Sequence, residues 1–145
     1  MFDQLAKNSL VPLLLRLGLA AIFVVHGVEK VNGEGNELGA AWGREMPDAP
    51  AKAMQLLVAW GELLGGAALG LGFLTRVAAA GIAAIMAGAI YKVTGSGGFS
   101  LQKGGYEYNF LIIIVCVALI LIGGGTLSVD RFFRWKRQVA GQPSR

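Results

Sequence analysis

Three side chains that can exchange protons lie in or beside long apolar stretches of this sequence. Glu62 interrupts the apolar segment 53–74, His26 lies near the end of the segment 10–28, and Glu107 stands before the uncharged run 111–125. A carboxylate or an imidazole that is held away from bulk water is suited to passing protons to a bound substrate. Glu62, His26 and Glu107 are therefore the candidate catalytic, proton-handling residues.

Cationic and hydrogen-bonding side chains accompany these three groups. Lys30 follows His26 by four residues, so the two share one face of a helix. Tyr108 and Asn109 directly follow Glu107, at the start of the last apolar segment. Such donors could bind an anion or the carbonyl oxygens of a small ligand. The candidate ligand-binding residues are Arg16, Lys30, Lys92, Tyr108 and Asn109.

Each candidate also has a structural interpretation. Arg16 could neutralise Glu62 or extend its charged head to the membrane surface. His26 could be a hydrogen-bonded polar residue at a helix end. Lys30 and Lys92 could be interfacial anchors, and Tyr108 could be an ordinary residue of the aromatic belt. Glu62 is the hardest to explain in this way, because an acid near the middle of a membrane is costly unless it has a partner or a role.

The sequence offers few groups for cofactor chemistry of its own. It holds one histidine and one cysteine, Cys116, so one chain supplies neither the usual zinc ligand set nor a disulfide. It has no nucleotide-binding glycine loop, serine-hydrolase motif or recognisable iron–sulfur spacing. We expect no metal site and no flavin or haem motif, so electrons for a redox reaction would come from a partner protein or a soluble donor.

Composition indicates that a bilayer surrounds the elements that position these groups. The 145 residues are 54% hydrophobic and 15% charged, whereas a soluble domain carries roughly 25% charged residues. Four segments approach the roughly 20 apolar residues that cross a membrane. We therefore expect an all-α, integral membrane four-helix bundle with a long outward first loop. It forms a single domain, 1–145, with helices at about 10–28, 53–74, 77–93 and 107–127 and a basic cytoplasmic tail at 130–145.

The connections constrain how the helices meet. Only Thr75 and Arg76 separate the second and third apolar segments, which predicts a tight antiparallel hairpin. In the second segment, Gly61 and Gly65, and Gly66 and Gly70, have the small-residue spacing that permits close helix contact. Within the long first loop, the stretch LGAAWGREM could be a short interfacial helix or a flexible loop.

Basic residues predict the orientation in the membrane. If both termini and the 75–76 turn share one side, that side holds seven basic residues and the other holds five. Five of those seven lie within 131–145, directly after an apolar segment. This pattern is typical of a cytoplasmic membrane flank and not of a nucleic-acid surface. We expect both termini in the cytoplasm and no nucleic-acid partner.

Four runs, LLLRLGLAAIFVVHGVEKV, WGELLGGAALGLGFLTRVAAAGIA, GGYEYNFLIII and LSVDRFF, follow one another over about residues 10–133. Taken in order, they resemble the DoxX family of small four-helix membrane proteins. The resemblance implies a multi-pass protein of the bacterial inner membrane that is a membrane subunit of an oxidoreductase. Founding relatives are associated with thiosulfate oxidation coupled to quinone reduction, and others with thiol-redox and oxidative-stress complexes. The absence of a cysteine pair puts an independent thiol-transfer role in doubt.

Two classes of function follow. In the first, the chain is a membrane subunit or accessory of a quinone- or thiol/sulfur-linked redox complex. A quinone headgroup would accept hydrogen bonds from His26 and Tyr108, and Glu62 or Glu107 would pass protons. In the second, the chain is a non-catalytic scaffold or a bundle that binds a small ligand or lipid. Expected partners are the bilayer, a redox partner or other complex subunits, and a second copy of the chain. The resemblance carries over to Arg16, His26, Lys30, Glu62, Arg76, Glu107, Tyr108 and Asn109.

Overall fold

The computed structural model describes residues 6–33, 38–43, 46 and 49–140. Within these residues the regular structure is entirely helical, which confirms the expected all-α membrane bundle. The elements are η1 (Ala6–Leu10), α2 (Val11–Asn32), α3 (Lys52–Leu71), α4 (Thr75–Ala89), η2 (Ile90–Thr94), η3 (Gly95–Gly97), η4 (Leu101–Lys103), α5 (Glu107–Ile122) and α6 (Val129–Ala140).

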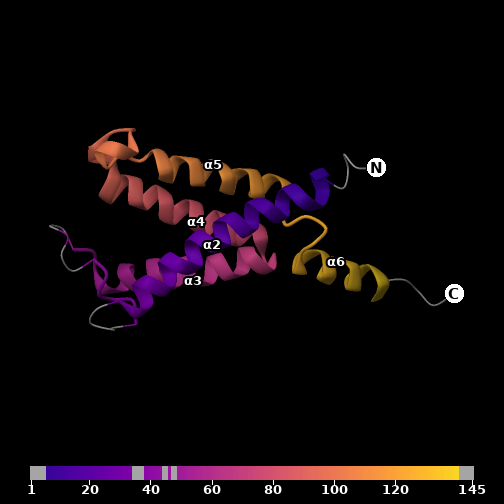
Figure 1. Ribbon diagram of the computed structural model, residues 1–145. Coiled ribbons are helices and arrows are strands. Elements are labelled where there is room, and N and C mark those ends of the chain that lie inside the picture. The colour runs from indigo at the N-terminus through magenta and orange to yellow at the C-terminus, as the bar shows by residue number, and fades with distance from the viewer. Residues whose placement is uncertain (1–5, 34–37, 44–45, 47–48, 141–145) are drawn as a thin grey trace.

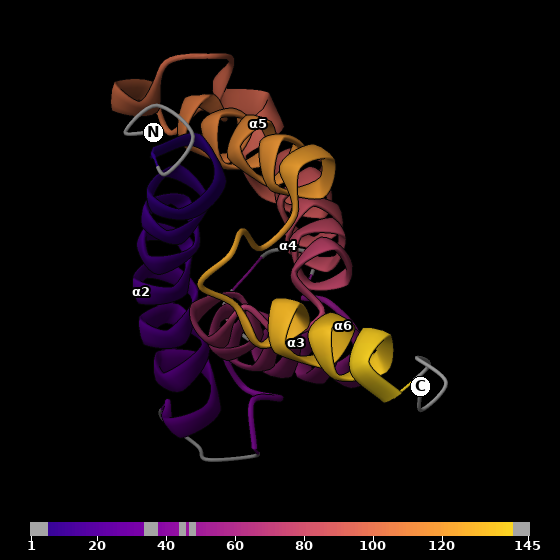
Figure 2. The same cartoon turned by 90° about the vertical axis from the view of Figure 1, so that its right-hand side faces the viewer.

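Four helices surround a common core, and a fifth lies beyond one end of them. Viewed end-on, α2, α3, α4 and α5 follow one another around a ring (Figure 2). Helix α6 lies past the end of α3, at the end of the bundle where α2 begins (Figure 1); we call this the inner end, and the opposite one the outer end. The buried core consists of Leu19, Phe23, Leu69, Ala79, Ile82, Met86, Ile112, Cys116 and Leu119.

Several boundaries differ from the sequence prediction. Helix α2 extends to Asn32 and not to 28, and α3 ends at Leu71 and not at 74. Thr75 and Arg76, expected to form the turn, begin α4 instead, and the turn lies at 72–74.

The fourth apolar helix ends at Ile122 and not near residue 127, because Gly123 (φ 78°) and Gly125 (φ 76°) have positive φ angles, which glycine adopts readily and which interrupt an α-helix. The basic tail expected at 130–145 is helical over part of its length, because residues 129–140 form α6. Ser128 begins this helix, since its hydroxyl accepts a hydrogen bond from the Arg131 backbone N–H at 3.2 Å.

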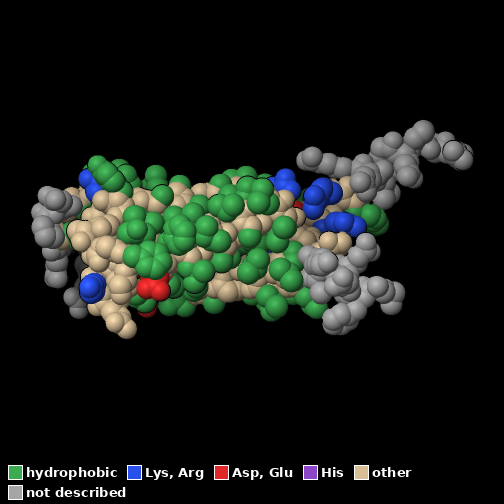
Figure 3. All heavy atoms as spheres, turned by 90° about the horizontal axis from the view of Figure 1, so that it is seen from above, with side chains coloured by type: hydrophobic (Ala, Val, Ile, Leu, Met, Phe, Trp, Pro, Cys, Tyr) green, Lys and Arg blue, Asp and Glu red, His purple; other side chains and the backbone are tan. Residues whose placement is uncertain are grey.

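The surface of the bundle suits a membrane. Three described stretches, Asn8–Asn32, Lys52–Leu71 and Thr75–Gly97, are long and apolar enough to cross one, and α5 is a shorter apolar helix. On the face in Figure 3, hydrophobic side chains cover the middle of the molecule and the Lys and Arg side chains gather at its two ends. The chain is therefore a multi-pass membrane protein.

Helices α2 and α3 touch backbone to backbone. A β-carbon placed on Gly27 would lie 2.5 Å from the backbone nitrogen of Leu63, and one on Gly66 would lie 2.9 Å from that of Val24. Neither position has room for a side chain. The predicted role of small residues in close helix contact is confirmed here.

A second pair of glycines on α3 faces another neighbour. β-carbons on Gly61 and Gly65 would lie 2.9 and 3.0 Å from the terminal methyl groups of Ile85 and Ile82 on α4. Helix α3 therefore uses two glycine faces, one against α2 and one against α4.

Replacing Gly27 by alanine tests the α2–α3 contact. We expect Gly27→Ala to lower the free energy of unfolding by roughly 1–3 kcal/mol, because the added methyl group meets the α3 backbone. Gly18→Ala on the same helix is the control, since a β-carbon added at Gly18 would meet nothing within 4 Å. Thermal unfolding of both variants in one detergent measures the difference. Equal stability of the two would contradict the close contact.

Arg16 joins three parts of the chain at the inner end. Its side chain is 1% exposed and donates four hydrogen bonds to backbone carbonyl oxygens. Nε bonds to Leu69 O (2.8 Å), Nη2 to Gly70 O (3.0 Å), and Nη1 to both Gly124 O (2.5 Å) and Leu127 O (2.8 Å). The carbonyls of the last turn of a helix have no partner within it. Arg16 thus donates hydrogen bonds to the carbonyl groups at the end of α3, and its bonds to Gly124 and Leu127 hold the segment between α5 and α6 in place.

The turn from α3 to α4 depends on the same region. Gly72 is left-handed (φ 69°), and a β-carbon on it would lie 2.7 Å from Cζ of Arg16. The Asp130 carboxylate accepts hydrogen bonds from the backbone N–H groups of Leu74 (2.7 Å) and Thr75 (2.9 Å). A residue of α6 therefore caps the first turn of α4.

Arg16→Lys tests whether this guanidinium holds the inner end together. A lysine keeps the charge but lacks the planar fork of donors, so at least one buried carbonyl loses its partner. We expect a loss of about 2–3 kcal/mol in the free energy of unfolding. The control is Arg76→Lys, since the exposed Arg76 makes one backbone bond, to Leu121 O at 3.2 Å. The account is wrong if both variants unfold at the same temperature.

The described part of the first loop folds onto α3. Residues 38–43 form turns, so this part of LGAAWGREM is not a helix. The indole of Trp42 donates to Gln55 O (2.9 Å), and the indole of Trp60 donates to Leu38 O (2.9 Å). The buried Gln55 side chain in turn donates to Pro50 O (2.8 Å). These bonds place the loop over the outer ends of α2 and α3.

Candidate functional site

Lys30 and Glu62 form a buried ion pair between α2 and α3. Lys30 Nζ lies 2.5 Å from Glu62 Oε2, and their side chains are 22% and 5% exposed. Lys30 follows Gly27 by three residues and Glu62 precedes Gly66 by four, so each lies one turn from the backbone contact. The close crossing of the two helices thus brings the charges together. The cation that pairs with Glu62 is Lys30 and not Arg16.

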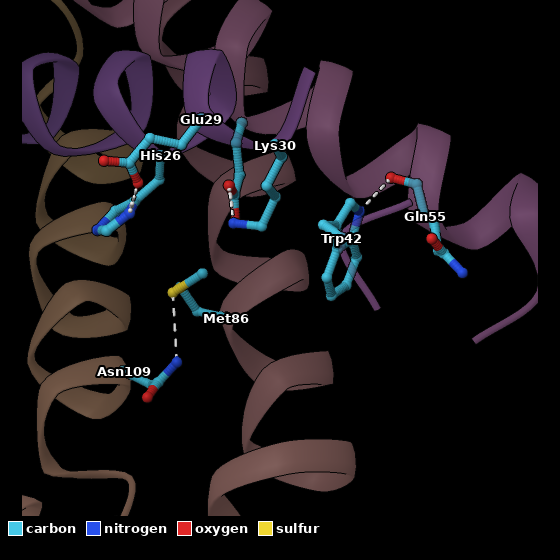
Figure 4. Close-up of polar contacts among 8 residues, drawn as sticks. His26, Glu29, Lys30, Trp42, Gln55, Met86 and Asn109 are labelled. Atoms are coloured by element: carbon cyan, nitrogen blue, oxygen red, sulfur yellow. Dashed lines mark hydrogen bonds and ion pairs between the residues drawn. The ribbon is translucent and has the colours of Figure 1, made fainter. Parts of the chain in front are cut away.

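The first loop completes the surroundings of this pair. Lys30 Nζ lies 5.5 Å from the centre of the Trp42 ring, within range of a cation–π interaction. Figure 4 shows Trp42 beside Lys30, with its indole directed at Gln55 on α3. The ammonium group therefore lies between a carboxylate and an aromatic face. Sequence analysis missed Trp42 and Gln55, and an isolated tryptophan in a long polar loop was the only available signal.

His26 is the more accessible polar group of α2. Its Nδ1 lies 3.3 Å from Glu29 Oε2, and the two side chains are 51% and 65% exposed. Nε2 makes no hydrogen bond to the described residues. Figure 4 places the ring beside Lys30 on α2, with Met86 and Asn109 below it on α4 and α5. His26 thus has one nitrogen available for a ligand.

Asn109 connects α5 to α4. Its Nδ2 lies 3.5 Å from the sulfur of the buried Met86, a weak acceptor. The side chain therefore faces the neighbouring helix and not the ion pair.

A small cavity of about 350 Å³ opens at the outer end of α5. Glu107 Oε2 accepts a hydrogen bond from the Leu101 backbone N–H (3.1 Å), which holds the preceding loop against the helix. The expected cation beside Glu107 is not found within the described part of the chain. Tyr108 is partly exposed, and its hydroxyl makes no hydrogen bond to that part either. The lining residues are Phe99, Leu101, Glu107, Tyr108, Phe110, Leu111 and Ile114.

The remaining candidates lie apart from these groups. Lys92 Nζ lies 5.7 Å from the centre of the Tyr91 ring, on the exposed surface of η2. Arg16 lies at the inner end of the bundle. No three His, Cys, Asp or Glu side chains of the described residues come together as metal ligands. The structure therefore does not gather the candidates into one cluster. It forms the Lys30–Glu62 pair, the exposed His26–Glu29 pair and the cavity with Glu107 and Tyr108.

Removing one member of the ion pair tests how the charges are balanced. We expect Lys30→Met to lower the free energy of unfolding by roughly 3–5 kcal/mol, because Glu62 then remains as an unpaired buried charge. The double variant Lys30→Met/Glu62→Gln should regain part of this loss, since it removes both charges. Chemical unfolding of the two single variants and the double variant gives the coupling free energy.

His26→Gln provides the control, because exposed pairs contribute about 0–1 kcal/mol. Strictly additive losses from Lys30→Met and Glu62→Gln would show that the two side chains do not interact.

Comparisons with known proteins cover most of the chain. The family model described as DoxX matches residues 11–95, more than half of the sequence. A Bacillus subtilis (strain 168) protein named "Putative oxidoreductase CatD" is 30% identical over 126 residues, 86% of this chain and 89% of the relative. A Haemophilus influenzae (strain ATCC 51907 / DSM 11121 / KW20 / Rd) protein named "Uncharacterized protein" is 28% identical over 130 residues, 84% of this chain and 82% of the relative. No solved structure matches significantly.

Proposed function

The chain belongs to the DoxX family, and we propose that it is a membrane subunit or accessory of a redox complex and binds a quinone at the outer end of α5. The name of the Bacillus subtilis relative, which describes an oxidoreductase, supports the redox association. The family match includes His26, Lys30 and Glu62, while the cavity at α5 lies beyond residue 95. Support for the quinone site therefore comes from the geometry of this chain and not from the family match.

The observation that carries the proposal is the cavity that places Glu107 and Tyr108 among apolar side chains. Small-molecule sites are typically concave and mostly apolar, with a few polar groups that set orientation. The volume of about 350 Å³ suits one aromatic ring system. The ring of Phe99 packs edge-on against Phe110, with centroids 6.4 Å apart, and forms part of the wall. The apolar tail of a quinone would extend along Leu111 and Ile114 toward lipid.

The polar groups of this region match the needs of quinone reduction, which consumes two electrons and two protons. The Tyr108 hydroxyl donates a hydrogen bond to one quinone carbonyl oxygen. Glu107 passes a proton to the reduced oxygen and regains it from water at the outer surface. His26 does not line this cavity, so the second proton also passes through Glu107 after it has been reprotonated. Electrons come from a partner protein or a soluble thiol or sulfur donor.

The Lys30–Glu62 pair has a different part in this scheme. Both charges are already matched, and Trp42 covers the ammonium group. The pair fixes α2 against α3 and so positions His26 one turn away. Lys30 and Glu62 are thus positioning residues for the outer end.

We also propose that the inner end faces the cytoplasm of a bacterial inner membrane. The basic residues of the inner end, including Arg76, Arg131, Arg134 and Lys136, are mostly clustered on α6, whereas those of the outer end in the described part of the chain, Lys30, Lys52, Lys92 and Lys103, are dispersed. This clustering supports the orientation, because dense positive charge beside a membrane span is typical of the cytoplasmic side. The cavity at α5 would then lie in the outer leaflet.

Tyr108→Phe tests the quinone site. Losing one neutral hydrogen bond should weaken binding of decylubiquinone about fivefold, as measured by calorimetric titration of the protein in lipid nanodiscs. Leu111→Trp, which fills the cavity from an exposed position, should abolish saturable binding. Tyr91→Phe is the matched control, since that ring is 83% exposed and lies outside the cavity. Unchanged affinity in both Tyr108→Phe and Leu111→Trp would refute the site.

One observation favours the second candidate function, a non-catalytic scaffold. The side of α4 that faces away from the other helices carries exposed small residues, and β-carbons on Gly81 and Gly88 would meet nothing within 4 Å. A flat face of this kind allows another membrane helix, or a second copy of the chain, to approach closely. Gently extracted protein would then carry a second membrane chain and no quinone.

A further inference from the structure

A second and larger cavity, of about 600 Å³, lies at the inner end of the bundle. It opens between the start of α2, the end of α5 and the first turns of α6. Neither the redox proposal nor the ion pair uses it. Its lining residues are Asn8, Val11, Pro12, Ile122, Gly125, Thr126, Arg131 and Arg134.

Two guanidinium groups on one face of α6 border this cavity. Arg131 and Arg134 are three residues apart and therefore lie on the same side of the helix. Neither side chain has a carboxylate partner among the described residues. The nearest acid in sequence, Asp130, is occupied by the backbone N–H groups that start α4. The cavity thus has a surplus of positive charge, and arginine is well suited to binding phosphate.

The opposite part of the cavity is apolar. Val11 and Ile122 line it and are 45% and 49% exposed on the outer surface of the bundle. They lie at the ends of two apolar helices, the depth at which the headgroup region of a bilayer meets the acyl chains. A ligand that fits must therefore combine an anionic group with an apolar part.

The exposed side chains of helix α6 suit a position at that depth of the membrane. Its aromatic residues Phe132, Phe133 and Trp135 are all at least half exposed, and Phe133 packs against Phe73 at the end of α3. Arg131 and Arg134 lie on one side of the helix and Phe132 and Phe133 on the other, a division that is typical of a helix in the membrane interface. Figure 3 shows Lys and Arg side chains gathered at this end of the molecule.

The walls of the cavity are held in place before any ligand arrives. The Thr126 backbone N–H donates to Asn8 O at 2.9 Å, and the hydroxyls of Ser9 and Thr126 share a hydrogen bond. These contacts tie η1, which leads into α2, to the segment between α5 and α6. A preformed site loses less conformational freedom on binding.

We propose that this cavity binds an anionic phospholipid, with the lipid phosphate at Arg131 and Arg134 and an acyl chain along Val11 and Ile122. Charge complementarity selects a lipid with net negative charge. A zwitterionic headgroup also carries a positive group, which the two arginines would repel. The apolar wall selects a lipid over free phosphate. This site is independent of the quinone proposal.

Native mass spectrometry of the purified full chain tests this lipid site. Phosphatidylglycerol is titrated into the protein in mild detergent, and phosphatidylcholine with the same acyl chains is titrated in parallel. We expect one phosphatidylglycerol to be retained per chain, and Arg134→Gln to weaken its binding about tenfold. Arg131→Gln should act similarly. Both residues are exposed, so folding should be unchanged, as circular dichroism would verify.

Lys136→Gln is the matched control, because it removes one charge from the same helix while Lys136 lies over the Phe132 ring (4.9 Å) and not at the cavity. We expect it to change the affinity less than twofold. An equal loss in Lys136→Gln would show general attraction to a basic helix and would overturn the proposal. Equal retention of phosphatidylcholine, or full displacement by excess inorganic phosphate, would also overturn it.

Discussion

The hydrogen bonds of the Arg16 guanidinium are the interaction on which the inner half of the bundle depends. In hydrocarbon, no water is available to satisfy the carbonyl groups at the end of a helix, so the protein must supply donors. One side chain of α2 supplies them to the end of α3 and to the segment after α5. That segment leads to Asp130, whose carboxylate accepts hydrogen bonds from the backbone N–H groups at the start of α4. A single buried cation thus connects the first helix with the rest of the bundle.

In the outer half of the bundle, by contrast, some polar atoms have no hydrogen-bond partner among the described residues and are available to a ligand. Lys30 and Glu62 satisfy each other, and Trp42 covers the lysine. His26 and Tyr108 retain atoms without partners among the described residues, and Tyr108 lines an apolar cavity. The bundle therefore separates groups that hold helices together from groups that can meet a ligand. Under the proposed function, the available groups are the ones that would meet a lipid-soluble substrate.

The sequence predicts the helices, the tight α3–α4 hairpin and the close glycine contacts, because composition and spacing determine these directly. The partner of Glu62 could not be predicted, because Arg16 and Lys30 lie on similar faces of one helix and the α2–α3 crossing decides between them. Glu107 was expected to meet a cation, but the glycine-rich loop turns back and presents the Leu101 N–H group instead. Helix α6 was not predicted, because the cluster of basic residues after the last apolar segment was interpreted only as a membrane flank. The quinone site itself stays a prediction.

The most direct test of the quinone-linked redox role is native mass spectrometry of the protein extracted gently from its own membrane, with quinones, lipids and protein subunits recorded together. The account predicts a bound quinone, retained with the chain or with a complex that includes a flavin- or haem-bearing subunit. A homo-oligomer without quinone, or a complex with a partner that carries no redox centre, would contradict it. The polar groups of the outer end would then be structural parts of a scaffold.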